Sequence, residues 1–119
     1  MAVSILLVDH EDAFRSLTAD RLRAAGHDRV YEEKTVAGAL RAAVALRPDV
    51  ALADIGLPDG DGFEVAGEIV QLAGAPGVVL ISANADAAYA DAAQRVGAIG
   101  FVAKEELEGA RLRRLLDGR

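Results

Sequence analysis

Four residues that can do chemistry each follow a short apolar run in this sequence: Asp9, Asp54, Ser82 and Lys104. Two carboxylates placed close together repel each other unless a cation lies between them, and hard oxygen donors of this kind suit Mg²⁺. A carboxylate beside such a cation can attack phosphorus as a nucleophile and form an aspartyl phosphate. An ammonium and a hydroxyl can then neutralise and hydrogen-bond the phosphoryl oxygens, because phosphoryl transfer depends mainly on positioning and charge neutralisation. The four residue types therefore predict phosphoryl-transfer chemistry.

Each of these residues also has an ordinary structural interpretation. An Asp or a Ser after a strand often caps the next helix, and a single Lys after a strand usually meets solvent. The combination is harder to explain in this way. Unrelated helix caps would not supply two anions, a hydroxyl and a cation after four core strands of one domain.

The elements that must position these residues are buried parallel strands, which short β-branched runs between Gly, Pro and charged residues favour. Strands are expected at 5–8, 30–34, 50–53, 78–81 and 99–103. Helical spacing predicts helices over 12–25, from Val36 to a stop at Arg47-Pro48, and over 63–73, 85–96 and 104–116. Strict alternation of strand and helix predicts an α/β fold, a doubly wound, flavodoxin-like, five-stranded parallel sheet with five helices and strand order 2-1-3-4-5. The switch point of that sheet would lie between the strands that end at Asp9 and Asp54.

Composition narrows the class of protein. The chain has 119 residues, which suits one domain over 1–119, and no apolar run approaches the ~18 residues of a membrane span. It has no cysteine, and residues 1–4 lack the features of a signal peptide, so we expect a cytoplasmic protein. The formal net charge of −6 argues against nucleic-acid binding.

The sequence resembles the receiver domain of two-component response regulators. The resemblance covers almost the whole chain and rests on four segments: Ile5–Asp9, Pro48–Gly62, Ile81–Ala83 and Gly97–Lys104. Its most specific part is the segment around Asp54 with the Leu-Pro-Asp-Gly loop that follows.

The resemblance assigns a role to each site residue. It makes Asp54 the phosphoacceptor, Lys104 the phosphate-binding lysine and Ser82 the switch hydroxyl. It places a Mg²⁺ site at Asp9, Asp54, the Gly56 backbone carbonyl and position 10, which is His10 in this chain. The domain would then be no enzyme in the ordinary sense, because it would catalyse only its own phosphorylation and dephosphorylation.

The resemblance also implies partners. The phosphoryl donor would be a phosphohistidine on a sensor histidine kinase or a histidine phosphotransfer protein. Phosphorylation would change the surface formed by the helix at 85–96, the strand at 99–103 and the helix at 104–116, with Phe101 repacking, and a downstream protein would bind there. No membrane or nucleic acid is expected, and a homodimer through this face stays open. We expect a stand-alone regulator, although the sequence does not decide whether it is part of a longer chain.

His10 departs from the family pattern, in which a second acid follows Asp9. Neutral imidazole is a poor ligand for Mg²⁺, so we expect weaker Mg²⁺ binding. Three interpretations stay open: Glu11 or Asp12 supplies the missing oxygen, the site works with weakened Mg²⁺ or with a metal that accepts nitrogen such as Mn²⁺, or phosphorylation has been lost. The third would make the chain a pseudo-receiver, an interaction module that acts without phosphorylation.

An aspartyl-nucleophile phosphatase is a further alternative for the same constellation. Such phosphatases carry a second Asp two residues after the nucleophile. Gly56 stands at that position here, which counts against hydrolase chemistry.

Overall fold

The structure is a computed structural model that describes residues 2–84 and 86–117. Five parallel strands form one sheet in the order β2-β1-β3-β6-β7. Their bounds are β1 Ile5–Val8, β2 Val30–Glu33, β3 Val50–Asp54, β6 Gly77–Ser82 and β7 Gly100–Ala103. Because β6 and β7 are the fourth and fifth strands of this sheet, the predicted order 2-1-3-4-5 is confirmed.

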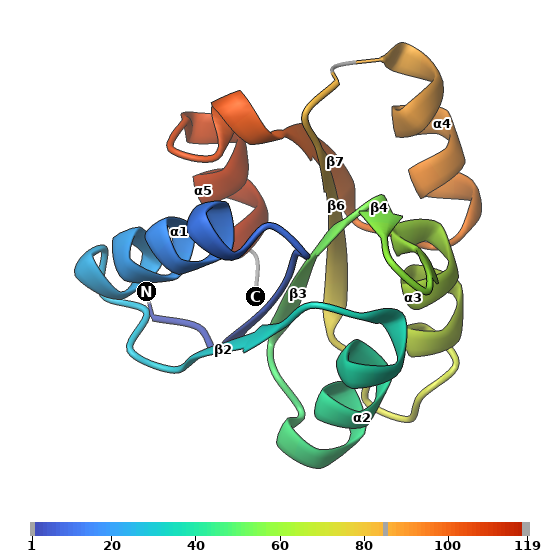
Figure 1. The fold of residues 1–119 in the computed structure, drawn as a ribbon, viewed down its shortest axis with the longest axis horizontal. Helices are drawn as coiled ribbons and strands as arrows, with labels where there is room; N and C mark the ends of the chain where they lie inside the picture. The colour runs from blue at the N-terminus through green and yellow to red at the C-terminus, as the bar shows by residue number, and fades with distance from the viewer. Residues whose placement is uncertain (1, 85, 118–119) are drawn as a thin grey trace.

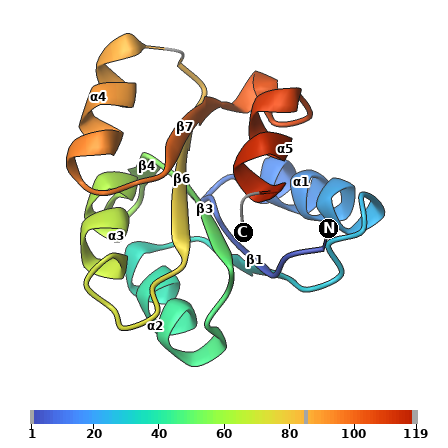
Figure 2. The ribbon, with the colours of Figure 1, turned by 180° about the vertical axis from the view of Figure 1, so that it is seen from behind.

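Helices cover both faces of the sheet, as Figures 1 and 2 show. Helices α1 (Asp12–Ala24) and α5 (Ala110–Asp117) lie on one face, and α2 (Val36–Leu46), α3 (Gly62–Ile69) and α4 (Ala87–Arg95) lie on the other. Side chains alternate between the faces along each strand. In β1, Ile5 and Leu7 therefore pack towards α1 and α5, whereas Leu6 and Val8 pack towards α2 and α3.

Burial is greatest in the three central strands. All residues of β1, β3 and β6 are buried, which explains why they read as continuous apolar runs. The edge strand β2 is more polar and only partly buried. None of the helices in the described part of the chain is long and apolar enough to cross a membrane.

Several predicted boundaries were wrong. The loop at 56–62 contains a small antiparallel hairpin, β4 (Gly56–Leu57) and β5 (Gly60–Asp61), which lies outside the main sheet. Helix α3 ends at Ile69, four residues before the predicted end, because the chain passes into turns ahead of Gly74 and Pro76. The predicted helix at 85–96 begins on a residue outside the described part of the chain, and α4 itself starts at Ala87.

The predicted helix at 104–116 is two helices in the structure. A 3₁₀ turn, η1 (Lys104–Glu106), follows β7 directly, and α5 begins only at Ala110. Leu107 donates its N–H to the Lys104 carbonyl oxygen at 3.4 Å, three residues back, which is the spacing of a 3₁₀ turn. Lys104 consequently sits on a tight turn at the strand end.

The segment after Asp54 is held in place by two acidic side chains. Asp59 accepts hydrogen bonds from the N–H groups of Val36 (2.7 Å) and Ala37 (3.1 Å) at the start of α2. These backbone donors lower the pKa of Asp59. Asp61 caps α3 by accepting from the Glu64 N–H at 2.8 Å. The hairpin is thus tied to two helices.

Two glycines of α3 provide a matched test of this packing. A Cβ at Gly62 would lie 2.5 Å from the Asp54 carbonyl oxygen, whereas a Cβ at Gly67 would meet nothing within 4 Å. We expect Gly62→Ala to lower the free energy of unfolding by about 1–3 kcal/mol, as overpacking does. Gly67→Ala should raise it by about 0.5–1 kcal/mol, because alanine favours the helix. Urea denaturation measures both, and similar shifts in the two variants would contradict the close approach at Gly62.

Candidate functional site

The structure brings Asp9 and Asp54 together at the edge of the sheet where β1 and β3 end. Asp54 is the last residue of β3, and Asp9 follows the last residue of β1. Asp9 is fully buried and Asp54 is 6% exposed. Backbone donors orient both carboxylates: Asp9 Oδ1 accepts from the Glu11 N–H at 2.9 Å, and Asp54 Oδ1 accepts from the Gly56 N–H at 3.1 Å. The predicted meeting of the two acids at the switch point is confirmed.

The Lys104 side chain reaches between these acids from the end of β7. Its Nζ lies 2.8 Å from Asp9 Oδ2 and 2.8 Å from Asp54 Oδ2. It also lies 2.8 Å from Glu11 Oε1, on the solvent side of the cluster, and 4.4 Å from the centroid of the Phe14 ring. The ammonium is therefore surrounded by three carboxylates and one aromatic face, an arrangement that holds it over the buried pair.

Burial and charge shift the ionisation of this cluster in two directions. Burial raises the pKa of Asp9 above its ordinary value, against the lowering effect of Lys104 and the Glu11 N–H. Desolvation acts to lower the pKa of Lys104, but its bonds to Asp54, Asp9 and Glu11 outweigh this and raise the pKa. Lys104 therefore stays charged at neutral pH, and Asp9 is the acid whose charged form is destabilised by burial.

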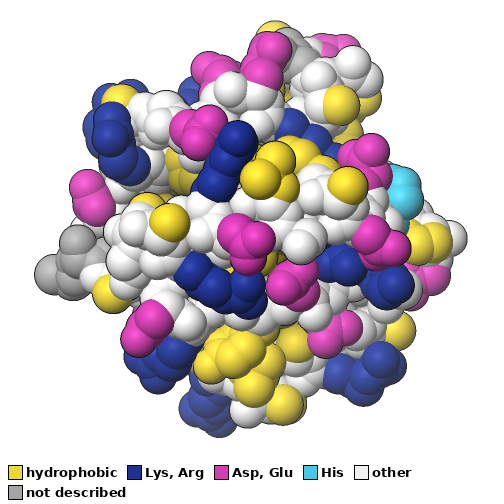
Figure 3. All heavy atoms as spheres, turned by 60° about the vertical axis from the view of Figure 1, so that its left-hand side comes forward, with side chains coloured by type: hydrophobic (Ala, Val, Ile, Leu, Met, Phe, Trp, Pro, Cys, Tyr) yellow, Lys and Arg dark blue, Asp and Glu magenta, His cyan; other side chains and the backbone are white. Residues whose placement is uncertain are grey.

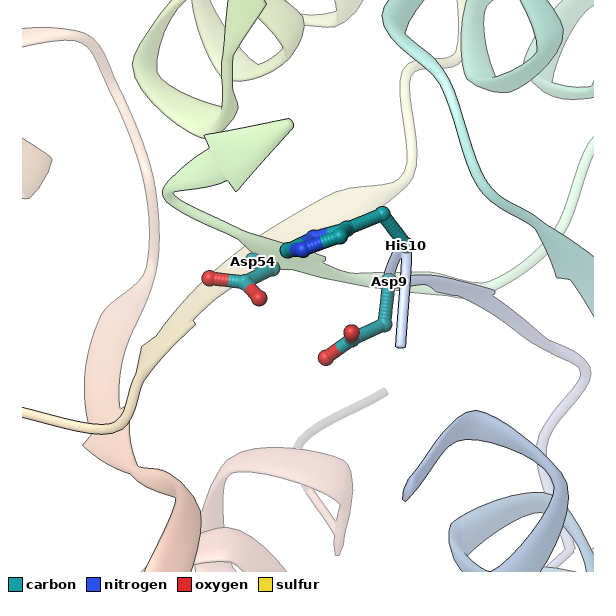
Figure 4. Close-up of side chains that lie close together, drawn as sticks. All are labelled: Asp9, His10 and Asp54. Atoms are coloured by element: carbon teal, nitrogen blue, oxygen red, sulfur yellow. The ribbon is translucent and has the colours of Figure 1, made fainter. Parts of the chain in front are cut away.

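His10 occupies the exposed rim of the site. Its Nδ1 lies 3.1 Å from the Gly56 carbonyl oxygen, to which the Nδ1–H tautomer donates. A nitrogen of His10 and one oxygen from each of Asp9 and Asp54 all lie within 4.8 Å of one another, and Figure 4 shows the three side chains converging. The four residues for which a metal site was predicted thus lie in one place.

Glu11 and Asp12 are both paired with basic side chains in the structure. Glu11 pairs with Lys104, and Asp12 pairs with Arg15 at 2.9 Å and with Lys34 at 3.6 Å. The interpretation in which either residue supplies the missing metal oxygen finds no support in these contacts. Sequence reasoning also missed Glu11 and Phe14 as neighbours of Lys104, although their places just before and within the first turns of α1 put them at this edge.

Ser82 lies at the same edge but is bonded elsewhere. It is the last residue of β6, the strand beside β3, and it is 5% exposed. Its Oγ accepts a hydrogen bond from the Asn84 N–H at 3.1 Å. The hydroxyl hydrogen is not used by that bond, so it can donate to a group bound next to Asp54.

The donor set fits a divalent cation. Asp9 Oδ2 is buried, and the Lys104 ammonium that pairs with it also pairs with Asp54 and Glu11. One positive charge among three carboxylates leaves net negative charge, which a divalent cation would offset. Asp54 and the Gly56 carbonyl supply further oxygens, and His10 supplies a nitrogen.

Comparison with known proteins identifies the family. A sequence model of the response regulator receiver domain matches residues 5–117. The chain belongs to the response regulator receiver domain family. The fold and the acidic cluster described above therefore belong to a receiver domain, a type that takes part in two-component signalling and generally binds a divalent cation at an acidic pocket.

Individual relatives agree with this assignment. The KDP operon transcriptional regulatory protein KdpE of Escherichia coli is 35% identical over 101 residues, which are 85% of this chain and 44% of that protein. The DNA-binding transcriptional activator DevR/DosR of Mycobacterium tuberculosis is 36% identical over 114 residues, 94% of this chain and 52% of that protein. The chain thus spans about half the length of these relatives.

A solved structure extends the likeness to three dimensions. The two-component response regulator of the LuxR family from Aurantimonas sp. SI85-9A1 superposes with a TM-score of 0.84 at 27% identity. The match covers all of this chain and 88% of that one.

The raised pKa of Asp9 predicts the effect of neutralising it. In metal-free buffer at pH 7 we expect Asp9→Asn to raise Tm by a few degrees, because it removes a desolvated charge. An acid whose pKa is raised on folding costs stability as pH climbs from its unfolded value, 3.8, to its folded value. The gain should therefore shrink as pH falls towards 3.8, which thermal denaturation across pH measures.

Asp12→Asn is the matched control, since it makes the same charge change in an exposed residue. Its bond to Arg15 and the charge of Lys34 lower the pKa of Asp12, so this substitution should leave Tm unchanged or reduce it at pH 7. Equal effects of the two substitutions would show that overall charge, and not burial of Asp9, sets the response.

Proposed function

We propose that Asp54 accepts a phosphoryl group from a phosphohistidine of a sensor histidine kinase or a histidine phosphotransfer protein. The observation that carries this proposal is the position of Asp54 at the strand end, 2.8 Å from the Lys104 ammonium and beside Asp9. The chain would act as a signalling switch in a two-component system. It would catalyse only its own phosphorylation and dephosphorylation, and no separate substrate is turned over.

The reaction is a displacement at phosphorus. A carboxylate oxygen of Asp54 attacks the phosphorus, the O–P bond forms as the P–N bond breaks, and the electron pair of that bond returns to the imidazole of the donor. Lys104 neutralises charge on the phosphoryl oxygens, and the Ser82 hydroxyl donates to one of them. Because Asp54 Oδ1 is held by the Gly56 N–H, the carboxylate is oriented before the donor arrives.

A divalent cation would be held by Asp9, Asp54 and the Gly56 carbonyl. Mg²⁺ bound there supplies positive charge that lowers repulsion between the carboxylates and the incoming phosphoryl group. Lys104 already shares both carboxylates, so this side chain has to give up part of its contact with them. Because His10 stands where the family has an acid, the site has one oxygen ligand fewer. This lowers its affinity for Mg²⁺ and makes Mn²⁺ an alternative ion.

The signal would leave the site through a cluster of tilted aromatic rings between α3, α4 and β7. The Tyr89 ring of α4 lies 5.8 Å from the ring of Phe101 in β7 and 6.3 Å from that of Phe63 in α3. Phe101 is buried, and Ala93 is the one residue of α4 classed as buried in the described structure. A shift of Ser82 towards a phosphoryl group would change the packing of Phe101, and α4 is held loosely enough to respond.

The partners in this proposal are proteins. A phosphorylated receiver would present the face formed by α4, β7 and α5 to a downstream target or to a second copy of itself. Neither nucleic acid nor a membrane is among the proposed partners. The net charge is −6, and the face in Figure 3, which carries α1, shows acidic and basic side chains interspersed without a continuous basic area.

A second candidate is the pseudo-receiver, which two contacts favour. Lys104 pairs with both Asp9 and Asp54, and His10 contacts the carbonyl oxygen of Gly56. In this alternative the site is a fixed structural centre, and the surface binds a partner without phosphorylation.

Intact mass after incubation with acetyl phosphate and a divalent cation separates the two candidates. We expect a hydroxylamine-labile gain of one phosphoryl group that Asp54→Asn abolishes. Asp61→Asn is the matched control and should keep the gain, because asparagine caps α3 as well as aspartate does. No gain with either Mg²⁺ or Mn²⁺ would favour the pseudo-receiver.

The cluster of Phe63, Tyr89 and Phe101 predicts an optical readout of the switch. The chain has two tyrosines and no tryptophan, so Tyr31→Phe leaves Tyr89 as the sole tyrosine. In that background we expect phosphorylation to change tyrosine fluorescence, because the surroundings of Tyr89 repack. Ser82→Ala should still take up the phosphoryl group, detected by mass, but should lose most of the fluorescence change. An equal change with and without the hydroxyl would remove Ser82 from the pathway.

A further inference from the structure

The residue at position 10 gives this site a donor of a different chemical kind. Two buried carboxylates and a backbone carbonyl supply oxygens, whereas His10 brings an imidazole to the open side of the cluster. Figure 4 shows the ring lying over the gap between Asp9 and Asp54. The ring is exposed, so an ion can approach it from solvent without unfolding any element.

The contact between His10 and Gly56 suits metal binding in either tautomer. When Nδ1 carries the proton, it donates to the Gly56 carbonyl and leaves the Nε2 lone pair free, as is usual for a metal-binding histidine. When Nδ1 is unprotonated, its distance of 3.1 Å from the carbonyl oxygen matches adjacent ligands of an octahedral ion, which are about 3.0 Å apart at bonds of ~2.1 Å. In either tautomer one ring nitrogen keeps a free lone pair.

The charge balance of the cluster is a second observation that favours a cation. Asp9 Oδ2 is fully buried, and the Lys104 ammonium lies 2.8 Å from it. That ammonium also contacts Asp54 and Glu11, so one positive charge is shared by three carboxylates and the cluster keeps net negative charge. A divalent cation bound to these oxygens would supply the missing positive charge.

We propose that this site selects a first-row transition-metal dication of the class from Mn²⁺ to Zn²⁺ over Mg²⁺, with His10 as the nitrogen ligand. The proposal deepens the function proposed above and rests on it for its biological meaning. Imidazole suits Zn²⁺, Co²⁺ and Ni²⁺, whereas Mg²⁺ takes oxygen ligands and keeps much of its water. With two carboxylates, one carbonyl and one imidazole, the site keeps enough oxygens for Mn²⁺ and gains affinity along the series to Ni²⁺.

The comparison of Ni²⁺ with Mg²⁺ isolates the contribution of His10. The two ions have the same charge and nearly the same size, so electrostatic attraction to Asp9 and Asp54 affects both alike. A nitrogen ligand adds to the affinity for Ni²⁺ much more than to that for Mg²⁺. The change in the ratio of the two dissociation constants when position 10 is substituted therefore reports the donor at that position.

The chain offers a matched control for histidine. It has two histidines and no cysteine, so His27 is the other soft donor. The Nδ1 of His27 accepts a hydrogen bond from the Val3 N–H at 3.1 Å, in the loop between α1 and β2. His27→Gln keeps an acceptor there and removes the imidazole, which tests for adventitious binding elsewhere on the molecule.

The experiment is calorimetric titration of untagged protein with Mg²⁺, Mn²⁺, Co²⁺, Ni²⁺ and Zn²⁺, with visible absorption of the Co²⁺ form as a second readout. We expect affinity to rise from Mg²⁺ through Mn²⁺ to Ni²⁺. His10→Asp should tighten Mg²⁺ and reduce the preference for Ni²⁺ over Mg²⁺ by about tenfold or more, with a changed Co²⁺ spectrum. His10→Ala should reduce the same preference without tightening Mg²⁺, and His27→Gln should match the unsubstituted chain.

Two results would overturn the proposal. One is a preference for Ni²⁺ over Mg²⁺ that is unchanged in both His10→Asp and His10→Ala. The other is a preference that falls as much in His27→Gln as in the two substitutions of His10. Metal binding is measured without any phosphodonor, and phosphorylation of Asp54 is measured separately by mass at saturating Mg²⁺. A chain that shows the metal preference but takes up no phosphoryl group contradicts the proposed function alone, and the reverse result contradicts the metal proposal alone.

Discussion

Two carboxylates lie buried where the central strands end, and one ammonium offsets part of their charge. Lys104 contacts Asp9 and Asp54 at 2.8 Å each, and it directly follows β7, which lies two strands away from β3. Without that cation, two desolvated negative charges would face each other at the switch point of the sheet. The ion pairs therefore connect the strand ends of β1, β3 and β7.

These ion pairs also limit the chemistry. Any cation that enters must share Asp9 and Asp54 with Lys104, and any phosphoryl group must draw Lys104 partly away from Glu11. The three carboxylates around one ammonium keep net negative charge, and the exposed His10 adds a nitrogen donor beside them. Both features lie where an ion would bind.

The sequence predicted the sheet and the meeting of Asp9, Asp54 and Lys104, because strand register alone fixes where the carboxyl ends emerge. It did not predict the partner of Glu11, since that depends on which way a flexible side chain turns. The end of α3 and the break before α5 were also missed, because weak 3₁₀ and turn hydrogen bonds decide them rather than hydrophobic periodicity. Ser82 was placed at the correct edge, but its bond to the Asn84 N–H depends on local backbone geometry that spacing does not specify.

The tether between Asp59 and α2 has a mechanical consequence. Asp59 lies three residues beyond Gly56, and both of its oxygens are bonded to the first N–H groups of α2. Movement of the hairpin as its carbonyl changes partner would therefore pull on the start of α2, on the face of the sheet opposite α1 and α5. Helix α2 would then register the loading state of the metal site through two backbone hydrogen bonds, separately from the aromatic route through Tyr89.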